Sequence, residues 1–195
     1  MTVDLILLVL NEIDGLRAVV PKIDRSLFGQ VFAVDGGSKD GSIEFLAENG
    51  IAVVNQSRRG RGQAFTMGVE HSTADAFVFF SPDGNEDPAD LARIVGELQQ
   101  GADLVIASRM MKGAVNEEDA QLLRPRRWTN NAFNLALNAL FNPRPVGGFI
   151  TDSINGYRGL ARKALPKVQP FPDDYTVEYR MTARALQARL KIVEF

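Results

Sequence analysis

The sequence contains no cysteine and a single histidine, His71. Without cysteine, a disulfide framework, an iron–sulfur cluster and thiolate-bound zinc are excluded. One histidine also excludes a metal site built from several imidazoles. Chemistry based on a thiol or on a serine–histidine pair is therefore disfavoured.

The sequence also lacks a large excess of charge and a long apolar run. The formal net charge is −2 and the isoelectric point is near 5.5, so no overall positive field favours nucleic acid, and we expect no such partner. The early apolar run over residues 3–10 is interrupted by Asp4. It is too short to span a bilayer and has no basic leader of a secretory signal. We therefore expect a cytoplasmic protein.

The 195 residues, 45% of them hydrophobic and 24% charged, match one globular domain with a sizeable core. We find no repeat, low-complexity stretch or glycine–serine linker, which predicts a single domain over residues 1–195. Five short apolar runs have the composition of strands buried on both faces, at residues 3–10, 31–34, 51–54, 76–80 and 104–107. Segments with helical spacing lie between them. This alternation predicts an α/β fold with a mostly parallel sheet, helices on both faces and ligands beyond the carboxyl ends of the strands.

The alternation stops after Ser108. Residues 110–119 read as a polar loop and residues 121–142 as a long helix, interrupted early by Pro125, with an apolar stripe at Phe133, Leu137, Leu140 and Phe141. A final helix over residues 174–189 and a strand over residues 190–195 follow. We expect this part to form an accessory helical layer. A strand that reaches the last residue without a cap or turn is typical of a chain that is cut short.

Acidic or amide side chains lie at the ends of two of the predicted strands. Asp35 ends the second strand, and Asp83 and Asn85 come just after the fourth. Carboxylate and amide oxygens suit Mg²⁺ or Mn²⁺, which need few protein ligands when phosphates complete the shell. Both segments are equally compatible with ordinary acidic turns before capped helices.

The third predicted strand is followed by the sequence SRRGRGQA at residues 57–64. Guanidinium groups and the backbone N–H groups at a helix N-terminus can together hold phosphate. The glycine spacing is not that of a dinucleotide fingerprint, and a solvated basic loop is the alternative.

Six segments, taken in order, resemble the motifs of a GT-A glycosyltransferase of family 2, in its polyprenyl-phosphate (dolichol-phosphate mannose synthase-like) branch. They are Asn11-Glu12, VDGGSKDGS at 34–42, RGRGQA at 59–64, LVIASR at 104–109, TDSINGYR at 151–158 and TVEY at 176–179. The resemblance covers nearly the whole chain. It implies a GT-A fold, with a nucleotide-sugar-binding half over residues 1–109 and an acceptor-side half over residues 110–195.

The resemblance implies inverting transfer of a hexose from a GDP- or UDP-linked sugar, helped by Mg²⁺ or Mn²⁺. Asp83 and Asn85 would hold the metal. The residues expected at the nucleotide sugar are Asn11, Glu12, Asp35, Gly37, Arg61, Gly62, Ser81 and Asp83.

The acceptor implied by the resemblance is a polyprenyl phosphate at the inner face of a membrane. A phosphate monoester is already largely ionised at neutral pH, so it needs cationic side chains rather than a base. The residues expected to bind it are Arg109, Arg124, Arg126, Arg127 and Asn130. Asp83, Arg109, Arg126 and Asp152 are the expected catalytic residues, with Asp152 as the base if the acceptor is a hydroxyl. The arginine run also fits a solvated helix start or a contact with anionic headgroups.

Two positions depart from the family pattern. Ser81 replaces the first acid of the D-x-D metal motif, and Gly36 replaces the second acid of the D-D pair. Weaker metal binding and an uncertain base preference follow from these losses. The alternatives are a glycosyltransferase acting on a sugar hydroxyl, a nucleotidyltransferase on a related fold, and a catalytically weak nucleotide-sugar-binding relic. A nucleotidyltransferase would need a glycine-rich basic loop after the first strand, where this sequence has Asn11-Glu12.

Overall fold

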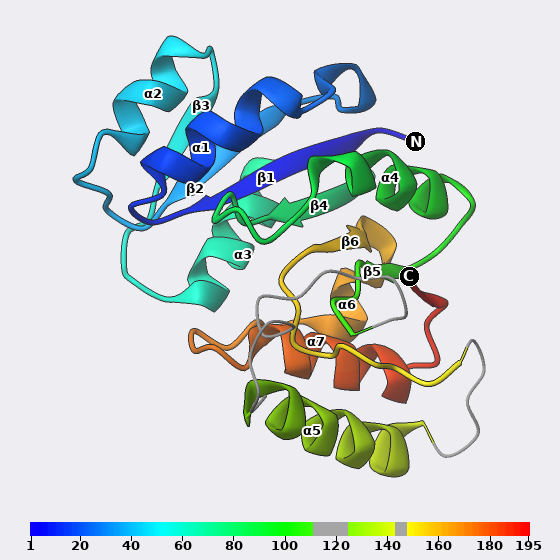
Figure 1. Cartoon of the computed structure of the whole chain (residues 1–195). Helices are drawn as coiled ribbons and strands as arrows, with labels where there is room; N and C mark the ends of the chain where they lie inside the picture. Colours follow the sequence, from blue (N-terminus) through cyan, green and yellow to red (C-terminus); the bar gives the residue numbers. More distant parts are fainter. Residues whose placement is uncertain (111–124, 143–147) are drawn as a thin grey trace.

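A single sheet forms the centre of the protein, as seen in the computed structural model, which describes residues 1–110, 125–142 and 148–195 (Figure 1). Its strands in the described ranges are β1 (Val3–Val9), β2 (Val31–Asp35), β3 (Ala52–Asn55), β4 (Ala76–Phe80), β5 (Leu104–Ile106), β6 (Arg158–Ala161) and β7 (Ile192–Glu194). They are ordered β3-β2-β1-β4-β6-β5-β7. The five strands predicted from apolar runs are confirmed.

The strand β6 was not predicted from the sequence. It lies between β4 and β5 and is antiparallel to both, while the pairs β1–β2, β1–β4, β2–β3 and β5–β7 are parallel. A strand from the second half of the chain thus completes the sheet of the first half. The carboxyl ends of β1, β2, β4 and β5 face the same edge.

Helices cover both faces of the sheet. They are α1 (Ile13–Val19), α2 (Ser42–Glu48), α3 (Arg61–His71), α4 (Leu91–Gln99), α5 (Pro125–Phe141), α6 (Leu165–Val168) and α7 (Val177–Gln187). Short 3-10 turns occupy Val20–Lys22, Arg25–Leu27, Pro88–Asp90 and Arg162–Ala164. Asp87 caps the turn before α4 as predicted, because its Oδ1 accepts from the Ala89 N–H at 3.0 Å.

Two apolar cores result from the alternation of side chains along the strands. Leu5 and Leu7 of β1 belong to the core beneath α1, α2 and α4. Ile6 and Leu8 point to the opposite face, where the core contains residues of α3, α6 and α7. The sheet is therefore buried on both sides, as the near-continuous apolar runs indicated.

The helix α5 forms an outer layer against α7, which confirms the predicted accessory layer (Figure 1). The predicted apolar stripe of α5 is wrong in part. Leu137 is fully buried, but Phe133 and Leu140 are 51% and 69% exposed. The buried face instead includes Asn134 and Asn138, whose amides bind backbone groups of the segment 150–153. No helix in the described ranges is long and apolar enough to cross a membrane.

Candidate active site

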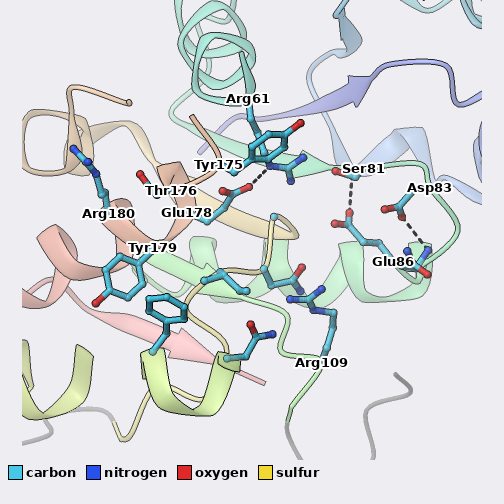
Figure 2. A pocket seen from close by; sticks show the side chains of 16 residues that line it. Arg61, Ser81, Asp83, Glu86, Arg109, Tyr175, Thr176, Glu178, Tyr179 and Arg180 are labelled. Atoms are coloured by element: carbon cyan, nitrogen blue, oxygen red, sulfur yellow. Dashed lines mark hydrogen bonds and ion pairs between the residues drawn. The ribbon is translucent and has the colours of Figure 1, made fainter. Parts of the chain in front are cut away.

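A cavity of about 590 Å³ opens beyond the carboxyl ends of β4 and β5. One wall comes from the loop after β4 and from the start of α3, and the other from α5, α7 and the segment 154–156 (Figure 2). Its lining residues are Arg61, Ser81, Asp83, Asn85, Glu86, Arg109, Asn130, Phe133, Ile154, Asn155, Gly156, Tyr175, Thr176, Glu178, Tyr179 and Arg180. This is the edge of the sheet where ligands bind in parallel α/β folds.

The loop after β4 brings two carboxylates to the cavity. Asp83 is exposed, and its Oδ1 accepts from the Asn85 N–H at 3.0 Å. Glu86 is only 8% exposed, and its Oε2 accepts from the Ser81 N–H at 2.6 Å (Figure 2). A tight turn thus places both acids at the tip of the strand.

The electrostatic environment of Glu86 is unusual for a carboxylate. Burial raises its pKa from 4.5 to about 8, and the charge of Asp83 adds to the increase. The hydrogen bond from Ser81 and the charges of Arg61 and Arg109 lower the pKa by less. Glu86 therefore takes up a proton near neutral pH when no cation is close to it.

Arg61, the first residue of α3, forms an ion pair with Glu178 of α7 across the cavity (Figure 2). Glu178 is almost fully buried, and 29% of the Arg61 side chain is exposed. The neighbouring Gly62 fits tightly, since a Cβ there would lie 1.6 Å from the Pro172 carbonyl oxygen. The start of α3 is thereby held against the segment that leads into α7.

Arg109, directly after β5, binds Asp152 through two hydrogen bonds. Its Nε lies 3.0 Å from Oδ2, and its Nη2 lies 3.2 Å from Oδ1. Asp152 is fully buried and also accepts from the Arg109 backbone N–H, while Glu194 of β7 accepts from the Asp152 N–H at 2.7 Å. Asp152 does not line the cavity. Its contacts make it the residue that orients Arg109.

The wall formed by α5 and α7 is partly aromatic. The rings of Phe133 and Tyr179 meet edge to face with centroids 6.0 Å apart. Asn130, three residues before Phe133 on α5, adds an amide to the same wall. Tyr175, before α7, is 87% exposed. This wall can contact both apolar and polar groups of a ligand.

The predicted residues at the ends of β1 and β2 lie beside the cavity rather than in its lining. The Asp35 carboxylate is fully buried and accepts from the backbone N–H groups of Gly37 and Ser38. Asn11 accepts from the Lys39 N–H at 2.9 Å. Partial burial, followed by the charges of Asp83 and Asp40, raises the pKa of Glu12. Glu12 is therefore within electrostatic range of the loop after β4.

The structure thus brings six predicted site residues together at the cavity: Arg61, Ser81, Asp83, Asn85, Arg109 and Asn130. Asn11, Glu12, Asp35, Gly37 and Gly62 lie outside the lining. Arg124 lies outside the described residues, and Arg126 and Arg127 belong to α5 with only their backbone described.

Sequence reasoning missed Glu86 and did not assign a role to Glu178. The sequence signal that could have identified Glu86 is an additional acid five residues after Ser81, the position where the family motif has an acid. Glu178 stood within the TVEY segment, but its pairing with Arg61 joins residues 117 positions apart.

The oxygen donors at the tip of β4 fit a divalent cation that relies on its substrate for most ligands. In the described ranges, no group of three or more histidine, aspartate or glutamate residues could enclose a metal. Asp83 and Glu86 nevertheless both line the cavity, and no hydrogen bond to the Asp83 Oδ2 is found among the described residues. Mg²⁺ and Mn²⁺ suit such sparse oxygen sites when phosphates supply the remaining ligands.

Comparisons with known proteins agree with this geometry. The model of the family "Glycosyl transferase family 2" matches residues 4–168. A glycosyltransferase named AglJ from Haloferax volcanii is 27% identical over 182 residues, which cover 93% of this chain and 57% of that protein. The polyprenol monophosphomannose synthase of Mycolicibacterium smegmatis is 25% identical over 198 residues, or 94% of this chain and 72% of that protein.

Among solved structures, glucosyl-3-phosphoglycerate synthase from Mycobacterium tuberculosis, in complex with Mn²⁺, UDP-glucose and phosphoglyceric acid, superposes with a TM-score of 0.75. The identity is 25%, and the match covers 99% of this chain and 68% of that one. The chain spans little more than half the length of AglJ. The fold is that of the GT-A glycosyltransferases, and the chain belongs to glycosyl transferase family 2.

Proposed function

We propose that this chain is the catalytic domain of an inverting glycosyltransferase that moves a hexose from a nucleoside diphosphate to a polyprenyl phosphate. The observation that carries the proposal is the composition of the cavity. Carboxylates at the tip of β4 lie on one side, and Arg109, held by a buried aspartate, lies across from them. Relatives named for transfer to polyprenol or dolichyl phosphate support the acceptor class.

The donor would bind at the tip of β4, with its nucleoside toward the ends of β1 and β2. The structural relative was solved with UDP-glucose and Mn²⁺, which favours a UDP-linked donor over a GDP-linked one as the first to test. Asp83 would hold the cation, with Asn85 beside it. When bound, a divalent cation would offset the charge that grows on the departing diphosphate.

The protein's own residues would position the two reacting anions. A phosphate oxygen of the acceptor would attack the anomeric carbon opposite the diphosphate, forming one C–O bond as the other breaks. Nη2 and Nε of Arg109 are engaged by Asp152, and the remaining Nη1 can bind the acceptor phosphate. No carboxylate needs to accept a proton, since the phosphate is already ionised. In this mechanism Asp152 orients Arg109 and does not act as a base.

The acceptor's lipid chain would leave the cavity along α5. Phe133 and Tyr179 form the aromatic wall there, and Leu135, Leu140 and Phe149 are more than half exposed nearby in the sequence. Such side chains can enter the boundary between headgroups and acyl chains. We therefore propose that the protein works at a membrane surface.

The test is transfer of radiolabelled sugar from a panel of UDP- and GDP-linked hexoses to a short-chain polyprenyl phosphate, with Mn²⁺ or Mg²⁺. We expect a labelled, solvent-extractable lipid from one donor and at least a 100-fold loss of rate in Arg109→Ala. Labelling of a free sugar acceptor, with none on the lipid, would contradict the phosphate acceptor. Binding of a donor without any transfer of sugar would instead support the alternative of a catalytically weak protein that only binds nucleotide sugars.

A further inference from the structure

The loop after β4 contains a feature that the proposed function leaves unexplained. Ser81 stands where the family motif has its first acid, yet the backbone N–H of Ser81 holds a carboxylate from another residue, Glu86, at 2.6 Å. The intervening residues turn back on themselves, with Gly84 at φ +87°. The turn therefore places the carboxylate of Glu86 beside position 81, where the family motif has an acid and this chain has a serine.

Two polar groups at this point have unused bonding capacity. Glu86 is 8% exposed and lines the cavity, and within the described part of the chain its Oε1 has no hydrogen-bond donor. The Ser81 Oγ is buried and likewise has no partner among the described residues. Among the described residues, Ser81 Oγ is the one side-chain polar atom that is both buried and without a partner, and such an atom calls for an explanation such as a missing ion or water.

The charge balance of the cavity indicates the sign of that ligand. The nearby cations Arg61 and Arg109 are each paired already, with Glu178 and Asp152. No ion pair within the described ranges involves Asp83 or Glu86. The two carboxylates that line the cavity are thus not neutralised by a direct ion pair within the described ranges, which favours a cation between them.

We propose that Glu86 supplies the carboxylate ligand that position 81 lacks, so that the divalent cation is held by Glu86 together with Asp83. This inference rests on the proposed function, because the cation is the one that accompanies the nucleotide sugar. Glutamate is one methylene longer than aspartate, and it reaches the tip of β4 from the far side of the turn. The Ser81 N–H orients its Oε2 and leaves Oε1 for the cation.

The experiment measures Mn²⁺ binding directly, by electron paramagnetic resonance of free Mn²⁺ in titrations with and without UDP. Glu86→Gln keeps the side-chain length and a carbonyl acceptor for the Ser81 N–H but removes the charge. We expect it to weaken Mn²⁺ binding about tenfold or more in the presence of UDP. Thermal unfolding of each variant checks that it is folded.

Asp87→Asn is the matched control, because it removes a charge from the same loop and preserves the cap on Ala89. Asp87 does not line the cavity. The Mn²⁺ affinity of the Asp87→Asn variant should therefore stay within about threefold of that of the native protein. The double variant Ser81→Asp with Glu86→Gln returns the acid to the family position. It should recover most of the lost affinity.

Three results would overturn the inference. If Glu86→Gln binds Mn²⁺ as tightly as the native protein, Glu86 is not a ligand of the cation. If Asp87→Asn loses as much affinity as Glu86→Gln, the effect comes from the overall charge of the loop. If the double variant does not recover Mn²⁺ affinity, an acid at position 81 cannot replace the one at position 86. If the native protein binds neither Mn²⁺ nor UDP, the proposed function is contradicted as well. Failure of the proposed function can thus be distinguished from failure of this inference alone.

Discussion

The two sides of the cavity are held in place in different ways. On the side of β1, β2 and β4, hydrogen bonds within and between the short turns after these strands hold the polar residues: Asp35 binds N–H groups two and three residues away, Asp83 binds one two residues away, and the turn after β1 binds the turn after β2 through Asn11. On the side of α5, contacts between distant segments do this work, such as Arg109 with Asp152 and Asn138 with Ile150. The first side can be recognised from local sequence, while the second depends on the assembled fold.

The largest effect should come from breaking the long-range pair. Arg109→Met leaves Asp152 buried without its cation, which we expect to lower the free energy of unfolding by about 3 kcal/mol. Chemical denaturation measures this loss. In the double variant Arg109→Met with Asp152→Leu, both charges are gone and most of the stability should return, while sugar transfer stays abolished. A double variant as unstable as the single one would contradict this account of the pair.

A pH effect is expected at the tip of β4. Because burial raises the pKa of Glu86, the metal-free folded protein binds a proton there that the unfolded chain releases above pH 4.5. Stability should therefore fall as the pH rises from about 4.5 to about 8, and this contribution should level off above pH 8. Denaturation across this range should show the fall in the native protein and a smaller one in Glu86→Gln. Parallel curves for the two would contradict the assigned burial.

A smaller effect is expected from the asparagines on the buried face of α5. The Asn138 amide donates to the carbonyls of Asn134 and Ile150 and accepts from the Ile150 N–H. Asn138→Ala should destabilise the protein by about 2 kcal/mol and slow sugar transfer, with donor affinity unchanged. Asn131→Ala, on the exposed side of the same helix, is the control. A loss of donor affinity in Asn138→Ala would show that the two sides are not independent.

The smallest change should come from the local side. The Ser38 hydroxyl donates to Asp35 and accepts from the Asn11 N–H at 2.8 Å. Ser38→Ala removes both bonds, yet two backbone N–H groups still bind Asp35. We expect a loss of about 1 kcal/mol in denaturant titrations, with transfer activity retained. A loss equal to that of Arg109→Met would remove the distinction between short-range and long-range support.

The same distinction explains what could be read from the sequence. Apolar runs predicted five strands because those strands are buried on both faces, and glycine–acid turns predicted the polar residues at their ends. The strand β6 was missed because Arg158–Ala161 contains a glycine and a charged residue and is defined by its partners β4 and β5. Arg158 is buried there because its guanidinium donates to the carbonyls of Asn155 and Glu178.

The helix α5 shows the limit of periodicity most clearly. The apolar pattern placed Phe133 and Leu140 in one stripe with Leu137, whereas both are exposed and the buried face carries Asn134 and Asn138. These amides are buried because backbone groups of the segment 150–153 form hydrogen bonds with them. No hydrophobic pattern can indicate such a partner, since it arises only when the two segments meet.

The most direct test of the account is a calorimetric titration of UDP-glucose into the native protein and into Asp83→Asn, each with and without Mn²⁺. We predict binding to the native protein that Mn²⁺ strengthens at least tenfold, and no such strengthening in Asp83→Asn. Equal enhancement by Mn²⁺ in both proteins would place the cation away from β4 and contradict the central claim.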